Sequence, residues 1–225
     1  MSTAQTEPGP EQDTLALLGL AAEFEFESFV RLASDSALAP TIGERQVIAR
    51  SAARALGRQE RLVARIAELG GDPAQTMSPF DGVIEDFELR TTAGTWSERL
   101  LKAFIGYAVA DDFLRLLAAG ADDVSRELVT SLLGDADYAE LVVGQLAVVL
   151  ADDVTASRLA LWGRRLVGDA LAVIQGAIVR QPAFGRLLAA GAAAEATADE
   201  DRVQRVFSVL TAEHTRRMER LGLAA

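Results

Sequence analysis

The sequence LLGLAAEFEFESFVRL, at residues 17–32, decides the fold class. Its apolar residues recur at steps of three and four, and such steps return to the same side of an α-helix. The face that they form consists of Leu18, Ala21, Glu25, Phe29 and Leu32. Glu25 therefore lies in the middle of an apolar stripe. The stretch predicts a long amphipathic helix with one ionisable side chain on its buried face.

The same spacing continues along the chain, and proline and glycine mark the gaps between its runs. The chain is rich in Ala and Leu and poor in aromatic residues, which favours helix over sheet. We expect an all-α fold, with four core helices in a bundle and two additional C-terminal helices. The predicted helices span residues 13–37, 42–69, 95–119, 122–150, 153–181 and 197–221, with a short helix within residues 81–89.

We expect one helical domain over residues 14–225, because the sequence contains no internal repeat and no sign of a second domain. Residues 1–13 are polar and include Pro8 and Pro10, so they predict a disordered leader rather than a signal peptide. Between residues 182 and 196 an Ala/Gly-rich stretch predicts a short helix followed by a flexible link.

Composition limits the partners of this chain. The formal net charge is −11, with 22 Lys and Arg against 33 Asp and Glu, so no nucleic acid partner is expected. No apolar run reaches the roughly 20 residues of a membrane span, and no membrane partner is expected. The absence of cysteine excludes disulfides and thiolate metal sites and fits a reducing compartment. We expect a cytoplasmic protein, with a homodimer or a protein partner of unknown identity as open alternatives.

Four consecutive predicted helices carry an ionisable residue within an apolar stripe. Arg58 follows Glu25 in this pattern, and Asp112 and Asp135 continue it, with Tyr138 near the edge of the last stripe. An unpaired buried charge costs several kcal/mol, so these side chains should meet one another, a metal or water. The alternative is that one or two of them face solvent or form isolated ion pairs.

The last two predicted helices repeat the pattern with Asp169 and His214, the only histidine in the chain. A lone histidine cannot assemble a zinc site, and we expect a structural hydrogen bond from His214 to Asp169 or Glu213 rather than catalysis. No catalytic residue is predicted, because the chain lacks a nucleophile elbow, a P-loop and a dinucleotide-binding glycine motif.

Three stretches carry a family resemblance: LLGL through LAPT at residues 17–41, WGRRLVG at 162–168 and HTRRM at 214–218. They resemble actinobacterial ferritin-like proteins related to the tRNA methylthio-isopentenyladenosine hydroxylases (the MiaE-like family), which are non-haem diiron enzymes. The resemblance implies a ferritin-like four-helix core with accessory helices. It also implies two irons, held by carboxylates from two helices and by a carboxylate-x-x-His pair from each of two others.

Carried over by position, this ligand set is incomplete. Glu25, Asp112 and Asp135 fall at carboxylate positions and are the retained metal-ligand positions. Ala55 and Arg58 stand in place of one carboxylate-x-x-His pair, and Tyr138 stands in place of the second histidine. An arginine cannot ligate iron, because its guanidinium is not deprotonated in proteins. The resemblance therefore implies a degenerate diiron site.

We expect a polar network in which Arg58 compensates Glu25, Asp112 and Asp135, with Tyr138 as a further hydrogen-bond donor. The resulting hypothesis is a non-catalytic binding or structural protein with no cofactor. One alternative is a metal-dependent, diiron-type hydroxylase of the tRNA-hydroxylase-like family with iron as cofactor, although an all-oxygen site suits Mg, Mn or Ca better. Another is a cavity between the core helices that binds a small apolar ligand.

Overall fold

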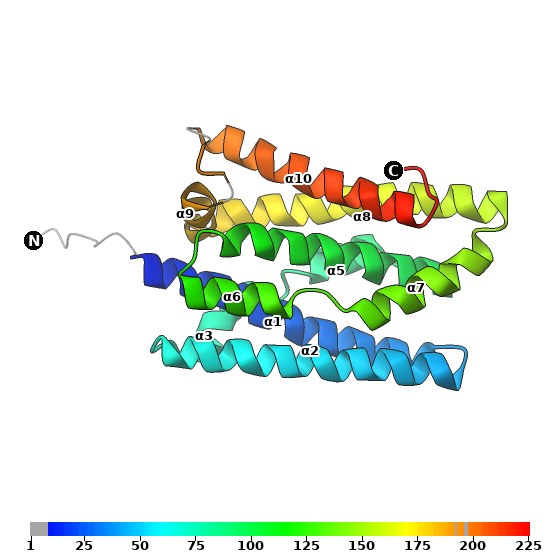
Figure 1. Cartoon of the computed structure of the whole chain (residues 1–225), viewed down its shortest axis with the longest axis horizontal. Coiled ribbons are helices and arrows are strands. Elements are labelled where there is room, and N and C mark those ends of the chain that lie inside the picture. Colours follow the sequence, from blue (N-terminus) through cyan, green and yellow to red (C-terminus); the bar gives the residue numbers. More distant parts are fainter. Residues whose placement is uncertain (1–8, 192, 196–197) are drawn as a thin grey trace, which may run out of the picture.

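The computed structural model describes residues 9–191, 193–195 and 198–225, and in them all regular structure is helical (Figure 1). The predicted all-α fold is confirmed. The long helices are α1 (Pro10–Leu38), α2 (Ile42–Glu68), α5 (Trp96–Ala118), α8 (Asp153–Arg180) and α10 (Asp199–Arg220), and the shorter ones are α6 (Asp123–Leu132), α7 (Ala136–Val149) and α9 (Pro182–Ala190).

Local capping fixes where two of the core helices begin. Thr41 precedes α2, and its hydroxyl accepts a hydrogen bond from the Glu44 backbone N–H, while the Glu44 carboxylate accepts one from the Thr41 N–H at 2.8 Å. Thr95 and Glu98 form the same reciprocal pair at the start of α5. Each pair satisfies two backbone donors that the first helical turn leaves without a partner.

The helices lie in layers, with α1 and α2 at one side, α5, α6 and α7 in the middle, and α8 and α10 at the other side (Figure 1). Helix α5 is central: it packs against α1, α6, α7, α8, α9 and α10. The four-helix core consists of α1, α2, α5 and the fourth segment, which is formed by α6 and α7.

The prediction of one continuous helix over residues 122–150 is wrong. The chain leaves the helical conformation at residues 133–135, where Gly134 has a φ of +87°. Asp135 then caps α7 by accepting a hydrogen bond from the Tyr138 N–H at 3.1 Å. Glycine adopts positive φ without the Cβ clash of other residues, and aspartate is a preferred N-cap. Glycine and aspartate together thus stop one helix and begin the next.

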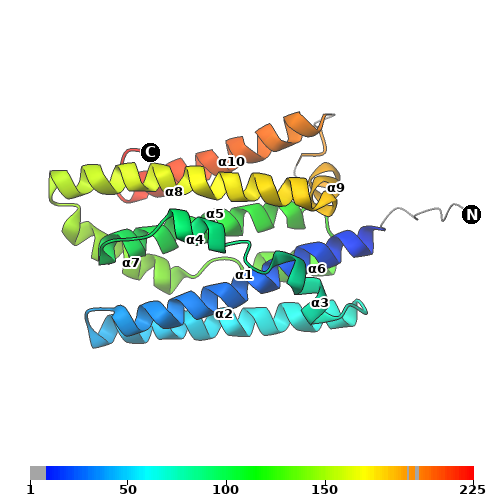
Figure 2. The same cartoon turned by 180° about the vertical axis from the view of Figure 1, so that it is seen from behind.

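The connection between α2 and α5 contains three short helical pieces, α3 (Pro73–Met77), η1 (Ser78–Phe80) and α4 (Glu85–Arg90). The predicted short helix within residues 81–89 corresponds to α4. In the view of Figure 2, α4 lies across the face of α5 and α8 that points toward the reader. Helix α4 covers a cavity that α1, α5 and α8 also line.

Two predictions concern the less regular ends of the helices. Residues 10–13 of the predicted leader are helical, because proline suits the first turn of a helix, and α1 begins at Pro10. Residues 1–8 lie outside the described residues. The predicted short helix after residue 182 is α9, and residues 192, 196 and 197 of the predicted link also lie outside the described part. In the described residues, no helix combines the length and the apolar character needed to cross a membrane.

A close approach of backbone to backbone places a strict demand on Gly19 in α1. A Cβ atom built there would lie 2.3 Å from the Thr76 carbonyl oxygen, whereas a Cβ at Gly57 in α2 would meet nothing within 4 Å. We expect Gly19→Ala to destabilise the protein by about 3 kcal/mol, since α3 must move away. The matched change Gly57→Ala should stabilise it by about 0.5–1 kcal/mol. Chemical denaturation of both variants measures the difference, and equal midpoints would contradict this close packing.

Candidate functional site

The centre of the candidate site is an ion pair between two core helices. Arg58 of α2 donates from Nε to Oε1 of Glu25 on α1 at 2.8 Å. The Glu25 side chain is only 4% exposed, and that of Arg58 is 18% exposed. Burial raises the pKa of Glu25 despite the neighbouring guanidinium. Burial also opposes the charge of Arg58, but its bond to Glu25 outweighs that effect and raises its pKa. The structure thus brings together two of the residues that the sequence placed in one network.

The third group at this position is Asp111, which sequence reasoning missed. Its Oδ2 accepts a hydrogen bond from the Gly134 N–H at 3.0 Å, so it is anchored to the break between α6 and α7. Burial, reinforced by the negative charge of Glu25, raises the pKa of Asp111 to about 7. Near neutral pH this carboxyl group is therefore close to half protonated.

Asp112, the residue that the sequence predicted at this place, points to another neighbour. Its Oδ1 accepts from Arg115 at 2.8 Å, and its Oδ2 lies 2.6 Å from Nη2 of Arg217 on α10. One residue along a helix is a rotation of about 100°. The change from Asp111 to Asp112 therefore moves the carboxylate from the four-helix core to the α5–α10 contact.

Asp135 also has a different partner from the predicted one. Arg54 of α2 binds it in a fork, with Nε 3.0 Å from Oδ2 and Nη2 2.7 Å from Oδ1. Burial opposes its ionisation, but the hydrogen bonds from Arg54 and from the Tyr138 N–H hold the pKa of Asp135 below its usual range. Tyr138 itself is buried, and burial raises its pKa, so its phenol stays protonated. The predicted single network is thus divided among four arginines, Arg54, Arg58, Arg115 and Arg217.

The predicted hydrogen bond from His214 to Asp169 does not form. His214 is 2% exposed, and neither ring nitrogen has a hydrogen-bond partner among the described residues, which also excludes a bond to Glu213. Burial, together with the charge of Arg217, lowers the pKa of His214 to about 4. Asp169 instead lies 3.6 Å from Arg165, one turn earlier on α8. His214 does lie on a buried face of α10, as the sequence predicts, but its neutral imidazole has no polar partner there.

These groups surround a cavity of about 440 Å³, which we call the bundle cavity. Its walls come from α1, α2, α5, α7 and α10, and its polar lining includes Glu25, Arg58, Asp111, Asp112 and Asp135. Buried carboxyl groups with raised pKa values beside a cation are typical of functional sites, although structural networks also produce them. The bundle cavity is therefore the candidate functional site.

The residues of the bundle cavity do not fit a diiron centre. Within the described ranges, no group of three or more His, Asp or Glu side chains is arranged to hold a metal ion. Oε1 of Glu25 accepts from Arg58, and both oxygens of Asp135 are bound by Arg54. A guanidinium keeps its charge and repels an incoming cation. In this site Glu25 and Asp135 are therefore held by arginines, and Asp111 by the Gly134 N–H.

This arrangement of helices defines a class of protein, the ferritin-like helical bundle, in which paired helices surround a polar site at their centre. A family model of the ferritin-like domain of actinomycetes matches residues 11–191, which run from α1 to the end of α9. The chain belongs to this ferritin-like family. No curated protein matches it.

Removal of the cation at the centre tests the role of the ion pair. We expect Arg58→Ala to destabilise the protein by about 3 kcal/mol at about pH 8, because Glu25 is left as an uncompensated buried charge. The cost should be smaller at about pH 5 than at about pH 8, because burial raises the pKa of Glu25 and loss of Arg58 removes the cation that favours its ionised form. Urea unfolding at both pH values measures this, with the exposed Arg61→Ala of the same helix as control. A cost that does not depend on pH would contradict the account.

Asp111 should reduce stability as it ionises. Its pKa rises from 3.8 to about 7 on folding, so the folded state binds more protons between these values and the contribution of Asp111 falls as pH rises through that window. We expect Asp111→Asn to stabilise the protein by on the order of 2 kcal/mol above pH 7 and to have little effect near pH 4. Thermal unfolding across this range measures it. Asp112→Asn is the matched control and should destabilise, because it weakens the bond to Arg217.

Proposed function

We propose that this ferritin-like protein has lost a diiron centre and acts as a non-catalytic binding protein. The observation that carries the proposal is the ion pair of Arg58 and Glu25 at 2.8 Å, at the place where the family resemblance implies metals. A metal-binding site needs carboxylates free to coordinate a cation, and here a permanent cation of the protein already occupies that role. Arg54 holds Asp135 in the same way.

The hydroxylase alternative receives less support from these contacts. Oxygen activation in ferritin-like diiron proteins depends on histidine and carboxylate ligands that converge between the helices. The one histidine of this chain is buried on α10, it does not line the bundle cavity, and burial lowers its pKa so that the ring is neutral. The net charge of −11 gives no support to a tRNA substrate.

Metal analysis tests the proposed function. We expect protein from iron-supplemented cells to contain far less than one iron per chain, and equilibrium dialysis against Fe²⁺, Mn²⁺ or Zn²⁺ to give equal, weak uptake by the natural chain and by Glu25→Gln. The variant is a suitable control because it removes the carboxylate charge with little change of shape. Stoichiometric iron in the natural chain that is lost in Glu25→Gln would overturn the proposal.

A further inference from the structure

A second cavity, of about 390 Å³, lies on the opposite side of α5 from the bundle cavity, and we call it the hydrophobic cavity. Its walls come from α1, α5, α8 and the segment that includes α4. The edge-to-face pair of Phe24 and Tyr107, with ring centroids 5.9 Å apart, lines both cavities and separates them. The volume lies in the range of ordinary small-molecule sites.

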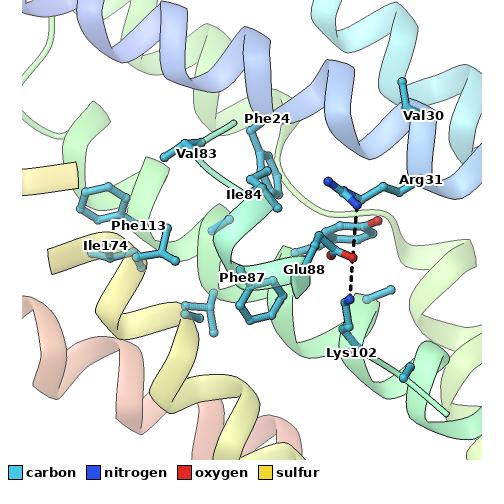
Figure 3. Close-up of a pocket in the computed structure, with 18 of the residues that line it drawn as sticks. Phe24, Val30, Arg31, Val83, Ile84, Phe87, Glu88, Lys102, Phe113 and Ile174 are labelled. Carbon is cyan, nitrogen blue, oxygen red and sulfur yellow. Dashed lines mark hydrogen bonds and ion pairs between the residues drawn. The ribbon is translucent and has the colours of Figure 1, made fainter. Parts of the chain in front are cut away.

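Most of the lining is apolar and comes from four different elements. Figure 3 shows the side chains that surround the space: Phe24, Val83, Ile84, Phe87, Phe113 and Ile174. Phe87, Phe113 and Ile174 are each less than 10% exposed, so this part of the lining is buried, whereas the lining residue Val30 is 45% exposed and lies where the cavity opens to solvent. A buried apolar lining of this kind favours contact with hydrocarbon over contact with water.

Helix α4 forms the cover of the hydrophobic cavity, and polar bonds hold it in place. Lys102 of α5 donates to the Thr91 carbonyl oxygen at 3.0 Å, and Arg165 of α8 donates to that of Arg90 at 2.6 Å. The ring of Phe87 packs closely on Gly106, where a Cβ atom would lie only 3.2 Å from it. Helix α4 is therefore fixed over the cavity, and Gly106 of α5 leaves room for the Phe87 ring.

One end of the hydrophobic cavity is charged, but its charges cancel. Glu88 of α4 bridges two cations, at 3.1 Å from Arg31 and 2.5 Å from Lys102 (Figure 3). Arg99 pairs with Asp35 at 2.9 Å, and Arg31 also binds Glu27 at 2.9 Å. Each of the three cations is thus paired with a carboxylate, of which Glu88 and Asp35 line the cavity and Glu27 lies outside its lining. A ligand with a charged head group would bury a charge without a counter-ion, which is costly.

The lining of the hydrophobic cavity also includes the hydroxyl groups of Ser34, Thr92 and Tyr107. The Nε atom of Arg31 is buried and has no hydrogen-bond partner in the part of the chain that the structure describes. Because that atom has almost no accessible surface, the hydroxyl groups of the lining, rather than Nε, are the donors that an uncharged head group can reach. The ligand that complements this cavity is therefore an apolar chain whose head group is uncharged and accepts a hydrogen bond.

We propose that the hydrophobic cavity binds an uncharged single-chain lipid-like molecule, of the class of a long-chain alcohol, with its head group beside Arg31, Glu88 and Lys102. The proposal names the ligand class of the binding role proposed above, and it rests on that proposed function. It places the ligand in a different cavity from the Arg58–Glu25 pair. The two proposals can therefore fail separately.

The test uses three probes with the same hydrocarbon chain: dodecanol, dodecanoate and dodecyltrimethylammonium. Each displaces the uncharged fluorophore N-phenylnaphthylamine from the full chain, and its Kd follows from the loss of fluorescence. We expect dodecanol to bind at least about tenfold more tightly than either charged probe, a difference of about 1.4 kcal/mol. Absence of fluorophore binding, or equal affinity for the three probes, would overturn the proposal.

Two pairs of variants locate the site. Glu88→Gln removes one carboxylate from the balanced end, so the preference for dodecanol over dodecanoate should fall by about tenfold, whereas the exposed Glu85→Gln of the same helix should keep it. Val173→Phe narrows the cavity and should weaken every probe, whereas Val179→Phe, on the 77% exposed position of the same helix, should not. Circular dichroism checks that each variant is folded. Unchanged binding by folded Glu88→Gln and Val173→Phe would place the ligand elsewhere.

Metal content measured in the same preparations separates the two proposals. Dodecanol binding by a chain with stoichiometric iron would overturn the proposed function and leave the ligand site standing. A chain without iron that binds none of the probes would overturn the ligand site alone.

Discussion

The burial of α5 on all sides is the constraint on which the rest of the structure depends. This helix packs against α1, α6, α7, α8, α9 and α10, so several of its charged side chains are buried, although Arg115 is 50% and Arg99 40% exposed. A buried charge needs a partner, and each partner must come from whichever helix faces it. Arg99 finds Asp35 on α1, Lys102 finds Glu88 on α4, and Asp112 finds Arg217 on α10. The charges of α5 thus specify how its neighbours are placed around it.

Among the ionisable side chains of α5, Asp111 has the least complete compensation for its buried charge. Its hydrogen-bond partner is the Gly134 N–H rather than an arginine, and its proximity to Glu25 adds repulsion to the cost of burial. The Arg58 guanidinium stands opposite two carboxyl groups, and one cation cannot fully compensate both. The raised pKa of Asp111 expresses this conflict, because protonation removes one of the two negative charges. A buried ion pair is weak evidence for stability, but removal of its one cation would leave two acids without compensation.

The sequence predicted most helices closely, because periodic apolar residues and capping motifs are local signals. It also placed Arg58 and Glu25 together from their positions on facing stripes. The sequence did not show which of Asp111 and Asp112 faces the four-helix core. Helix α5 packs against neighbours on several sides, so its apolar residues do not form a single stripe and either aspartate could lie on the buried face. The break at Gly134 was missed because apolar residues keep the helical period on both sides of it. The partners Arg54 and Arg217 depend on how helices cross, which periodicity does not encode.

Both cavities follow one electrostatic rule, and this rule bears on what the protein can recognise. In the bundle cavity, arginines from α2 and α10 hold Glu25, Asp135 and Asp112, and at the hydrophobic cavity each of three cations is paired with a carboxylate. A site whose charges are satisfied from within gains little from a charged ligand and must discriminate by shape and by apolar contact. The wall of Phe24 and Tyr107 keeps the two spaces distinct. The same arrangement of helices thus has two consequences. Arginines occupy the polar centre of the bundle cavity, and the hydrophobic cavity remains beside it.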